Sequence, residues 1–171
     1  MSPIDPIIQR VRIDRTARKI ETGSVWTHEP LTPELIAKHL NGGPARGCCP
    51  IKPGESTTMV ALFDLDSHKG ETPWPEMQKV ARSLHLSLQR VGLEPQAFRS
   101  SGGKGIHIIV MWGEPQDAYS VRAYLRSILA AEGFEDGTAG VAKGQIEVFP
   151  KQDYVPADGC GSMFILPLAG Q

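Results

Sequence analysis

The stretch Val60-Ala-Leu-Phe-Asp-Leu-Asp-Ser-His68 decides how the rest of the chain is interpreted. The apolar residues 59–63 are few, rich in strand formers and bounded by polar turns, which predicts a buried strand. Asp64 and Asp66 follow at its end. Because residues two apart on a strand project from the same face, the two carboxylates converge while Leu65 points into the core. Their mutual repulsion favours a divalent cation held by oxygen ligands.

A glycine-rich segment downstream bears on the choice between a metal site and a solvated acidic turn, which an isolated Asp-x-Asp also matches. The segment is Ser101-Gly-Gly-Lys-Gly-Ile-His107. Its glycines let the backbone adopt positive φ and bring amide groups close to a ligand, as phosphate-binding loops require. A hydroxyl, an ammonium group and an imidazole add donors suited to a triphosphate, whereas a plain hairpin turn explains only the glycines. The candidate nucleotide-binding residues in this segment are Ser101, Gly102, Gly103, Lys104, Gly105 and His107.

A third carboxylate for a metal site is expected at Glu147, on a short predicted strand. Ile146 and Val148 face the opposite way on such a strand, so Glu147 points alone toward one face of the sheet. The other interpretation of a single Glu in a strand is an exposed edge position. Asp153, just past the strand end, is the alternative third ligand.

The remaining pattern predicts alternating helices and strands. Two helices start at Thr-Pro pairs, because Thr can cap free amide groups and Pro suits the first helical position. We expect helices over 32–40, 72–92 and 117–133, and strands over 59–63, 96–100, 106–112, 145–149 and 163–168. Residues 101–105 join two strands as a hairpin, which favours an α+β fold with a mixed or antiparallel sheet over a doubly wound one.

Length and composition are those of an ordinary globular protein. The chain has 171 residues, of which 40% are hydrophobic and 22% charged, so it can bury a core as one domain or a pair of lobes. Its three cysteines form neither a regular disulfide framework nor a zinc signature. The sequence has no apolar run long enough to span a bilayer and no signal-peptide pattern, so we expect a cytoplasmic protein without a membrane partner.

Charge is distributed unevenly along the chain. The net charge of −1 argues against a protein coated in Lys and Arg for indiscriminate nucleic-acid binding. Residues 1–23 are locally basic, and we expect a basic N-terminal arm or helix before a catalytic core over 24–171. A solvated face or contact with a phosphate backbone would each explain this segment. Its basic residues are Arg10, Arg12, Arg15, Arg18 and Lys19.

Taken together and in this order, the motifs resemble those of the archaeo-eukaryotic primase superfamily. They are Phe-Asp-Leu-Asp at 63–66, Phe98-Arg-Ser-Ser-Gly-Gly-Lys-Gly-Ile-His107, and Ile-Glu-Val-Phe-Pro-Lys-Gln-Asp at 146–153. The first two are similar to motifs in the polymerase domain of bacterial end-joining ligases. The third is more similar to the primase-polymerases of mobile elements, phages and conflict systems, including those associated with CRISPR loci. Three ordered motifs are specific where each alone is not.

The resemblance implies a two-lobed catalytic core with an RRM-like sheet packed by helices. It also implies the activity of a DNA primase or DNA polymerase in DNA replication: template-directed nucleotidyl transfer from NTPs or dNTPs to a 3′ hydroxyl. Two Mg²⁺ or Mn²⁺ ions would be held by Asp64, Asp66 and Glu147. The triphosphate would be bound by the glycine-rich segment, with Arg99 and Lys151 as helpers. The implied partners are a single-stranded DNA template or primer and a helicase or other replication domain.

Two other classes stay open at this point. A non-catalytic RRM-like module for nucleic acid or nucleotides would use the same sheet. Its paired carboxylates would repel a phosphate backbone unless a metal masked them, and the predicted strands carry no aromatic pair suited to base stacking. A metal-dependent nuclease would use the carboxylates but has no need of a triphosphate loop.

Overall fold

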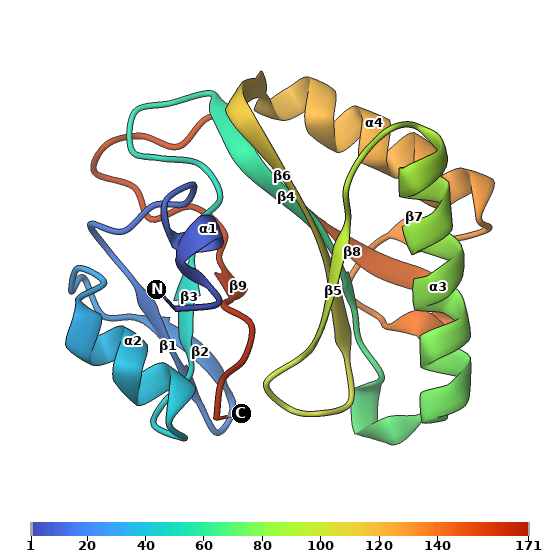
Figure 1. Cartoon of the computed structure of the whole chain (residues 1–171), viewed down its shortest axis with the longest axis horizontal. Helices are drawn as coiled ribbons and strands as arrows, with labels where there is room; N and C mark the ends of the chain where they lie inside the picture. Colours follow the sequence, from blue (N-terminus) through green and yellow to red (C-terminus); the bar gives the residue numbers. More distant parts are fainter. Residues whose placement is uncertain (1, 171) are drawn as a thin grey trace.

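The computed structural model describes residues 2–170, which form two lobes, each built around its own sheet (Figure 1). The small lobe holds a four-stranded sheet in the order β2-β1-β3-β9. The large lobe holds a five-stranded sheet in the order β5-β6-β4-β8-β7. This is the mixed α+β architecture that the sequence predicts. In the described part of the chain, no helix has both the length and the apolar character needed to cross a bilayer.

The small lobe is assembled from both ends of the chain. Its elements are α1 (Asp5–Ile8), β1 (Ala17–Ile20), β2 (Gly23–Trp26), α2 (Pro33–Leu40), β3 (Arg46–Cys48) and β9 (Phe164–Ile165). Its strands pair antiparallel, and β9 returns from the far end of the sequence to pair with β3. Helix α2 begins as predicted, because the Thr32 side chain accepts a hydrogen bond from the Leu35 amide and Pro33 occupies the first turn.

The basic segment 1–23 is folded into this lobe. It contains α1 and β1, and Ile4, Ile7 and Val11 are buried. The predicted boundary after residue 23 falls within the β1–β2 pair, whose last registered partners are Ile20 and Gly23. The segment therefore forms a short helix and a sheet strand. Its apolar residues are part of the core of the lobe, although in the sequence its basic residues are the more prominent feature.

The large lobe carries the longer strands and the longer helices. Its elements are β4 (Thr57–Leu65), η1 (His68–Gly70), α3 (Trp74–Arg90), β5 (Gln96–Arg99), β6 (Ile106–Asp117), α4 (Ala118–Ala131), β7 (Glu135–Asp136), η2 (Val141–Lys143) and β8 (Gln145–Phe149). All its strand pairs are antiparallel except β7 with β8, so the sheet is mixed. Strand β6 continues five residues past its predicted end, because Thr57 and Thr58 of β4 pair with Asp117 and Gln116.

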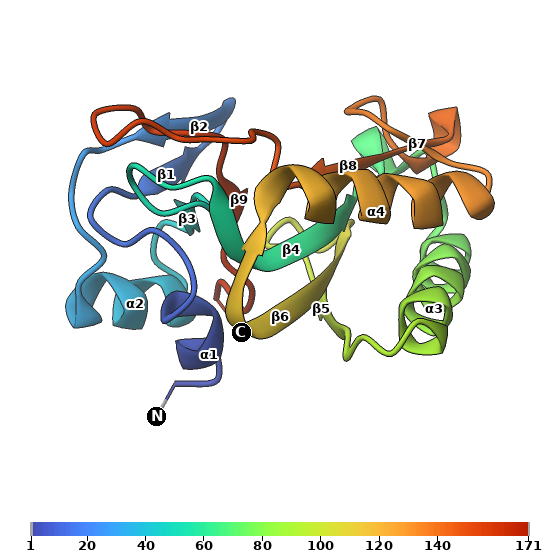
Figure 2. The ribbon, with the colours of Figure 1, turned by 90° about the horizontal axis from the view of Figure 1, so that it is seen from above.

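The two faces of the large sheet bury different partners. Residues such as Phe63 and Leu65 pack against α3 and α4, which lie on one side of the sheet (Figure 2). Their neighbours on the opposite face, including Leu62 and Ile109, pack against Ile4, Ile7 and Phe164 of the small lobe in a second cluster. Each fully buried side chain of this size contributes about 1.5–3 kcal/mol. Both faces of β4 are therefore fixed by packing, and its register cannot slip.

Candidate metal and nucleotide site

Three polar residues stand in one row across the centre of the large sheet. Asp64 on β4 is the registered partner of His107 on β6 and of Glu147 on β8. Cross-strand partners project from the same face of a sheet. That face is the one carrying Leu62 and Ile109, two residues away, so the row looks toward the small lobe. The alternation that buries Leu65 among the helices thus exposes Asp64 to the opposite side.

Asp66 joins this row just past the end of β4. Carboxylate oxygens of Asp64, Asp66 and Glu147 lie within 4.8 Å of one another. Burial, together with the charges of Asp64 and Glu147, raises the pKa of Asp66 to about 6 against the opposing effect of two histidines. The cluster therefore concentrates more negative charge than its surroundings balance.

Asp64 retains an unsatisfied oxygen. Its buried Oδ1 lies 3.2 Å from His107 Nε2, but the two atoms are not aligned as a hydrogen bond, and no other described group bonds to this oxygen. An unpaired buried carboxylate oxygen is costly. Together with the two neighbouring carboxylates, it forms the oxygen-rich donor set that Mg²⁺ and Mn²⁺ prefer.

His107 lies deeper than the sequence predicts for a phosphate ligand. Only 4% of its side chain is exposed, and its Nδ1 has no partner among the described residues. Burial is the largest single influence and lowers the pKa of His107, but the interactions with Asp64 and the charge of Asp66 together outweigh it, so the pKa is raised. The imidazole of His107 therefore lies against the Asp64 carboxylate.

The glycine-rich loop between β5 and β6 touches the acidic cluster at Gly105. A Cβ atom on Gly105 would lie 2.6 Å from the Leu65 carbonyl oxygen and 3.1 Å from Asp66 Oδ1. The loop closes through Ser100, whose hydroxyl accepts the Gly105 amide at 3.0 Å. Only glycine allows this approach, so the loop backbone and the carboxylates share one wall.

Two cations flank the loop, and one of them comes from the small lobe. Lys19 on β1 donates a hydrogen bond from Nζ to the Ser101 hydroxyl at 2.8 Å. The sequence marked Lys19 only as part of a basic segment, and no local pattern connects it with a loop 82 residues away. Lys104 is exposed at the edge of a cavity of about 240 Å³ and forms no ion pair within the described residues.

Arg99 braces the loop from the other side. Its guanidinium lies 4.4 Å above the ring of Trp74, and its Nε donates to the Gly103 carbonyl at 2.8 Å. Stacking over an aromatic ring fixes the planar guanidinium. Arg99 therefore positions the loop backbone, and Trp74 is a member of this arrangement that sequence reasoning missed.

The segment 146–153 contains two acidic residues, which the structure places apart. Glu147 lies in the cluster and is paired with Lys151, whose ammonium group stands 4.9 Å from the Phe149 ring. Asp153 is paired with Arg122 of α4, and 60% of its side chain is exposed. The structure thus brings Glu147, and not Asp153, to the two aspartates.

A family model described as the archaeo-eukaryotic primase domain of the TOTE conflict system matches residues 6–171. No curated protein matches the chain. A solved structure of the polymerase domain of Mycobacterium tuberculosis ligase D in complex with DNA is similar, with a TM-score of 0.57 and 16% sequence identity. The similarity covers 92% of this chain but 58% of that one, and at this identity it concerns the fold.

Proposed function

The chain belongs to the archaeo-eukaryotic primase family of the TOTE conflict system, and we propose that it is a nucleotidyltransferase that copies a DNA template. In this proposal it transfers nucleotides from NTPs or dNTPs to a 3′ hydroxyl and also makes primers. The observation that carries the proposal is the meeting of Asp64, Asp66 and Glu147 beside a loop suited to phosphate.

The acidic cluster is proposed to hold two Mg²⁺ or Mn²⁺ ions. Asp64, Asp66 and Glu147 would be the protein ligands, and the unsatisfied Oδ1 of Asp64 supports this assignment. When bound, such ions lower the pKa of the attacking hydroxyl and stabilise charge on the transferring phosphoryl group. His107 would hold the Asp64 carboxylate in place, as partners of metal ligands commonly do.

The loop and its cations are proposed to bind the incoming triphosphate. The backbone amide of Gly102, the Ser101 hydroxyl and Lys104 would supply donors and charge, while the Gly103 amide shapes the loop by donating to the Ser100 carbonyl at 2.9 Å. Lys19 already contacts Ser101 and would add a charge from the small lobe. Lys151 neutralises Glu147 in the structure and would turn toward the phosphates once the cluster has another cation. Arg99 would act through the loop backbone.

A single-stranded DNA template or primer is the proposed macromolecular partner. The solved relative is in complex with DNA, which supports this partner without identifying its path on this chain. A net charge of −1 gives no overall attraction to a polyanion. We therefore propose that a helicase or another replication domain helps to hold the template.

One assay separates this function from its two rivals. The protein is incubated with single-stranded template, labelled nucleotides and Mn²⁺, and the products are resolved by size. We expect primers or extended strands from the native chain and none from the Asp64→Ala/Asp66→Ala double variant, whose fold is checked by circular dichroism. Template binding without synthesis would support a binding module, shortened template would support a nuclease, and synthesis by the double variant would remove the metal assignment.

A further inference from the structure

A groove lies on the outside of the large lobe, between α3 and β5. Its volume is about 280 Å³. One wall is a stripe along α3 that includes Trp74, Gln78, Ala81 and Arg82. The other wall comes from β5 and β6. Arg99 and Trp74 at one end brace the glycine-rich loop, and the rest of the lining has no role in the proposed nucleotide transfer.

The groove runs beside an open sheet edge. β5 is the first strand of its sheet, paired with β6 on one side and with no strand on the other among residues 2–170. Figure 1 shows β5 as the front strand of the sheet, with α3 beside it. Such an edge presents unpaired N–H and C=O groups that can receive another extended chain.

The floor of the groove is apolar. Ala97 is exposed, Phe98 is half-buried, and Ala81 and Ile106 close the bottom. His85 is fixed, because its Nε2 lies at hydrogen-bonding distance, 3.1 Å, from the Pro95 carbonyl oxygen. The groove therefore offers an apolar floor for one side chain of a partner.

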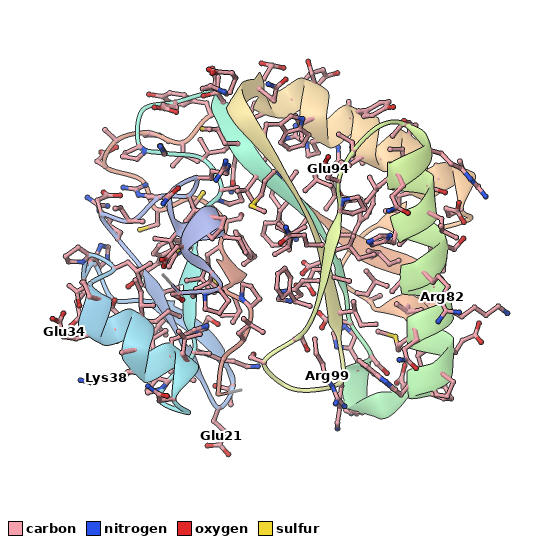
Figure 3. The ribbon with its side chains drawn as sticks, viewed as in Figure 1. Glu21, Glu34, Lys38, Arg82, Glu94 and Arg99 are labelled. Atoms are coloured by element: carbon pink, nitrogen blue, oxygen red, sulfur yellow. The ribbon has the colours of Figure 1, made fainter. Side chains whose placement is uncertain are left out.

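The charge of the lining has one sign. Arg82 and Arg99 are its two formal cations, both exposed, and no carboxylate lines the groove. None of the described acidic residues forms an ion pair with either arginine; the ion pair on α3 joins Lys79 to Glu76 instead. Figure 3 shows Arg82 on α3 and Arg99 beside the loop end of β5, with Glu94 at the opposite end of that strand. Acidic groups on a partner would thus be attracted here.

Nucleic acid fits these features less well than a peptide does. A base would need an open aromatic face to stack on, but the ring of Trp74 already has Arg99 above it at 4.4 Å. The open strand edge, in contrast, offers regularly spaced backbone partners that a peptide can use and a nucleotide cannot.

We propose that β5 and α3 form a docking site for an extended acidic peptide segment of another protein. The segment would add a strand at the outer edge of β5 and place one apolar side chain between Ala81 and Ala97. Its carboxylates would meet Arg82 and Arg99. This proposal does not depend on nucleotidyl transfer, because docking needs neither metal nor nucleotide.

The test uses a fluorescein-labelled decapeptide with valine at position 5, glutamate at positions 1, 3, 7 and 9 and threonine elsewhere, so that in an added strand the valine and the glutamates face the groove together. Its binding to the full chain is measured by fluorescence anisotropy. We expect saturable binding, together with slower hydrogen exchange of the amides of 96–99. A decapeptide with lysine in place of glutamate is expected to bind at least about tenfold more weakly. So is an acidic decapeptide whose central valine is replaced by proline, because it cannot pair along the edge.

Variants of exposed groove residues make the assignment specific. Arg82→Glu reverses a charge of the lining, and Gln78→Trp fills the groove from an exposed position on α3. Each is expected to weaken the Kd by about tenfold or more. Arg90→Glu changes the same charge on the same helix outside the lining and should leave the Kd unchanged.

Several results would overturn the proposal. They are undetectable binding of the acidic peptide, equal binding of the lysine peptide, or equal loss of binding in the Arg90→Glu control. A single-stranded dT ten-mer that binds the groove with the same sensitivity to Arg82→Glu, while the acidic peptide does not, would assign the groove to nucleic acid instead.

Discussion

The two lobes divide the work of the proposed site unequally. The large lobe supplies all three carboxylates and the glycine-rich loop, on a sheet whose central strands reach twelve residues and are buried on both faces beside the site. The small lobe has strands of two to four residues and contributes one side chain, Lys19, to the loop. Groups that must be held accurately stand on the rigid sheet, whereas the mobile charge of a lysine suffices from the other side.

The largest effect is expected from adding a methyl group at Gly105, where the loop of the large lobe packs against the carboxylates. Gly105→Ala would bring a Cβ within 2.6 Å of the Leu65 carbonyl oxygen, so the loop must move away from Asp66. We expect nucleotide incorporation to fall by about a hundredfold, the scale on which small misplacements of reacting groups act. Steady-state primer extension measures it.

Gly113→Ala is the matched control for that substitution. Gly113 lies on the same strand, and a Cβ there would meet no atom within 4 Å. Near-normal extension by Gly113→Ala and by Gly105→Ala alike would show that the close packing of loop and carboxylates does not matter for transfer.

The next effect tests how His107 acts. Since the imidazole stands against Asp64 and is almost fully buried, His107→Ala should weaken Mn²⁺ binding by about tenfold to a hundredfold, as loss of a ligand's supporting partner does. Electron paramagnetic resonance of free Mn²⁺ measures this without nucleotide. An unchanged Mn²⁺ affinity with a raised KM for nucleotides would instead make His107 a direct phosphate contact.

A smaller effect is expected in the pH dependence of stability. Because the folded pKa of Asp66 is raised to about 6 from 3.8, Asp66 favours folding when protonated. This contribution is complete below about pH 4 and is lost as pH rises through about 6. His107, with its raised pKa, acts in the same direction. The metal-free protein should therefore melt at a lower temperature at neutral pH than at about pH 5.

Thermal melts with and without Mn²⁺ check this dependence. Mn²⁺ should raise the melting temperature more at neutral pH, where the carboxylates are ionised, than in acid. Asp66→Asn should flatten the metal-free profile, since its side chain does not titrate. A profile that is equally steep in that variant would place the titrating group elsewhere.

The smallest effect is expected from the small lobe. Lys19→Ala removes one exposed hydrogen bond to Ser101, so the free energy of unfolding should change by less than about 1 kcal/mol. The KM for nucleotides should rise by only about threefold to tenfold if the ammonium group meets the triphosphate. Arg18→Ala, the exposed neighbour on β1, is the control and should leave the KM unchanged. If both substitutions raised the KM equally, Lys19 would act only through the general positive charge of β1.

Local patterns in the sequence predicted the parts of the site that depend on one strand or one turn. The period of two along β4 put Asp64 and Asp66 on the face opposite Leu65, and the glycines marked the loop. Helix α3 was bounded to within two residues by its Thr-Pro start and Gly92. These features depend on backbone geometry that neighbouring residues determine.

Features that depend on packing between distant segments were not predictable in this way. The sequence favoured Glu147 as the third carboxylate from its place alone on one face of a strand, but it did not predict the registration opposite Asp64, because neither strand alone determines the pairing of β4 with β8. Lys19, Trp74 and Ser100 carry no distinguishing local pattern. Their contacts arise only when the lobes and the α3–β5 pair are assembled.

The join between the lobes is unequal along its length. At one end, Ile4, Ile7 and Val11 share an apolar cluster with Val60 and Leu62 of β4, each worth about 1.5–3 kcal/mol. At the other, Lys19 and Ser101 share one exposed hydrogen bond, worth about 1 kcal/mol. If the lobes move apart, the polar end should therefore open first, with the apolar end as the pivot. In the proposed function, substrate would enter at the polar end, where the least free energy is needed to separate the lobes.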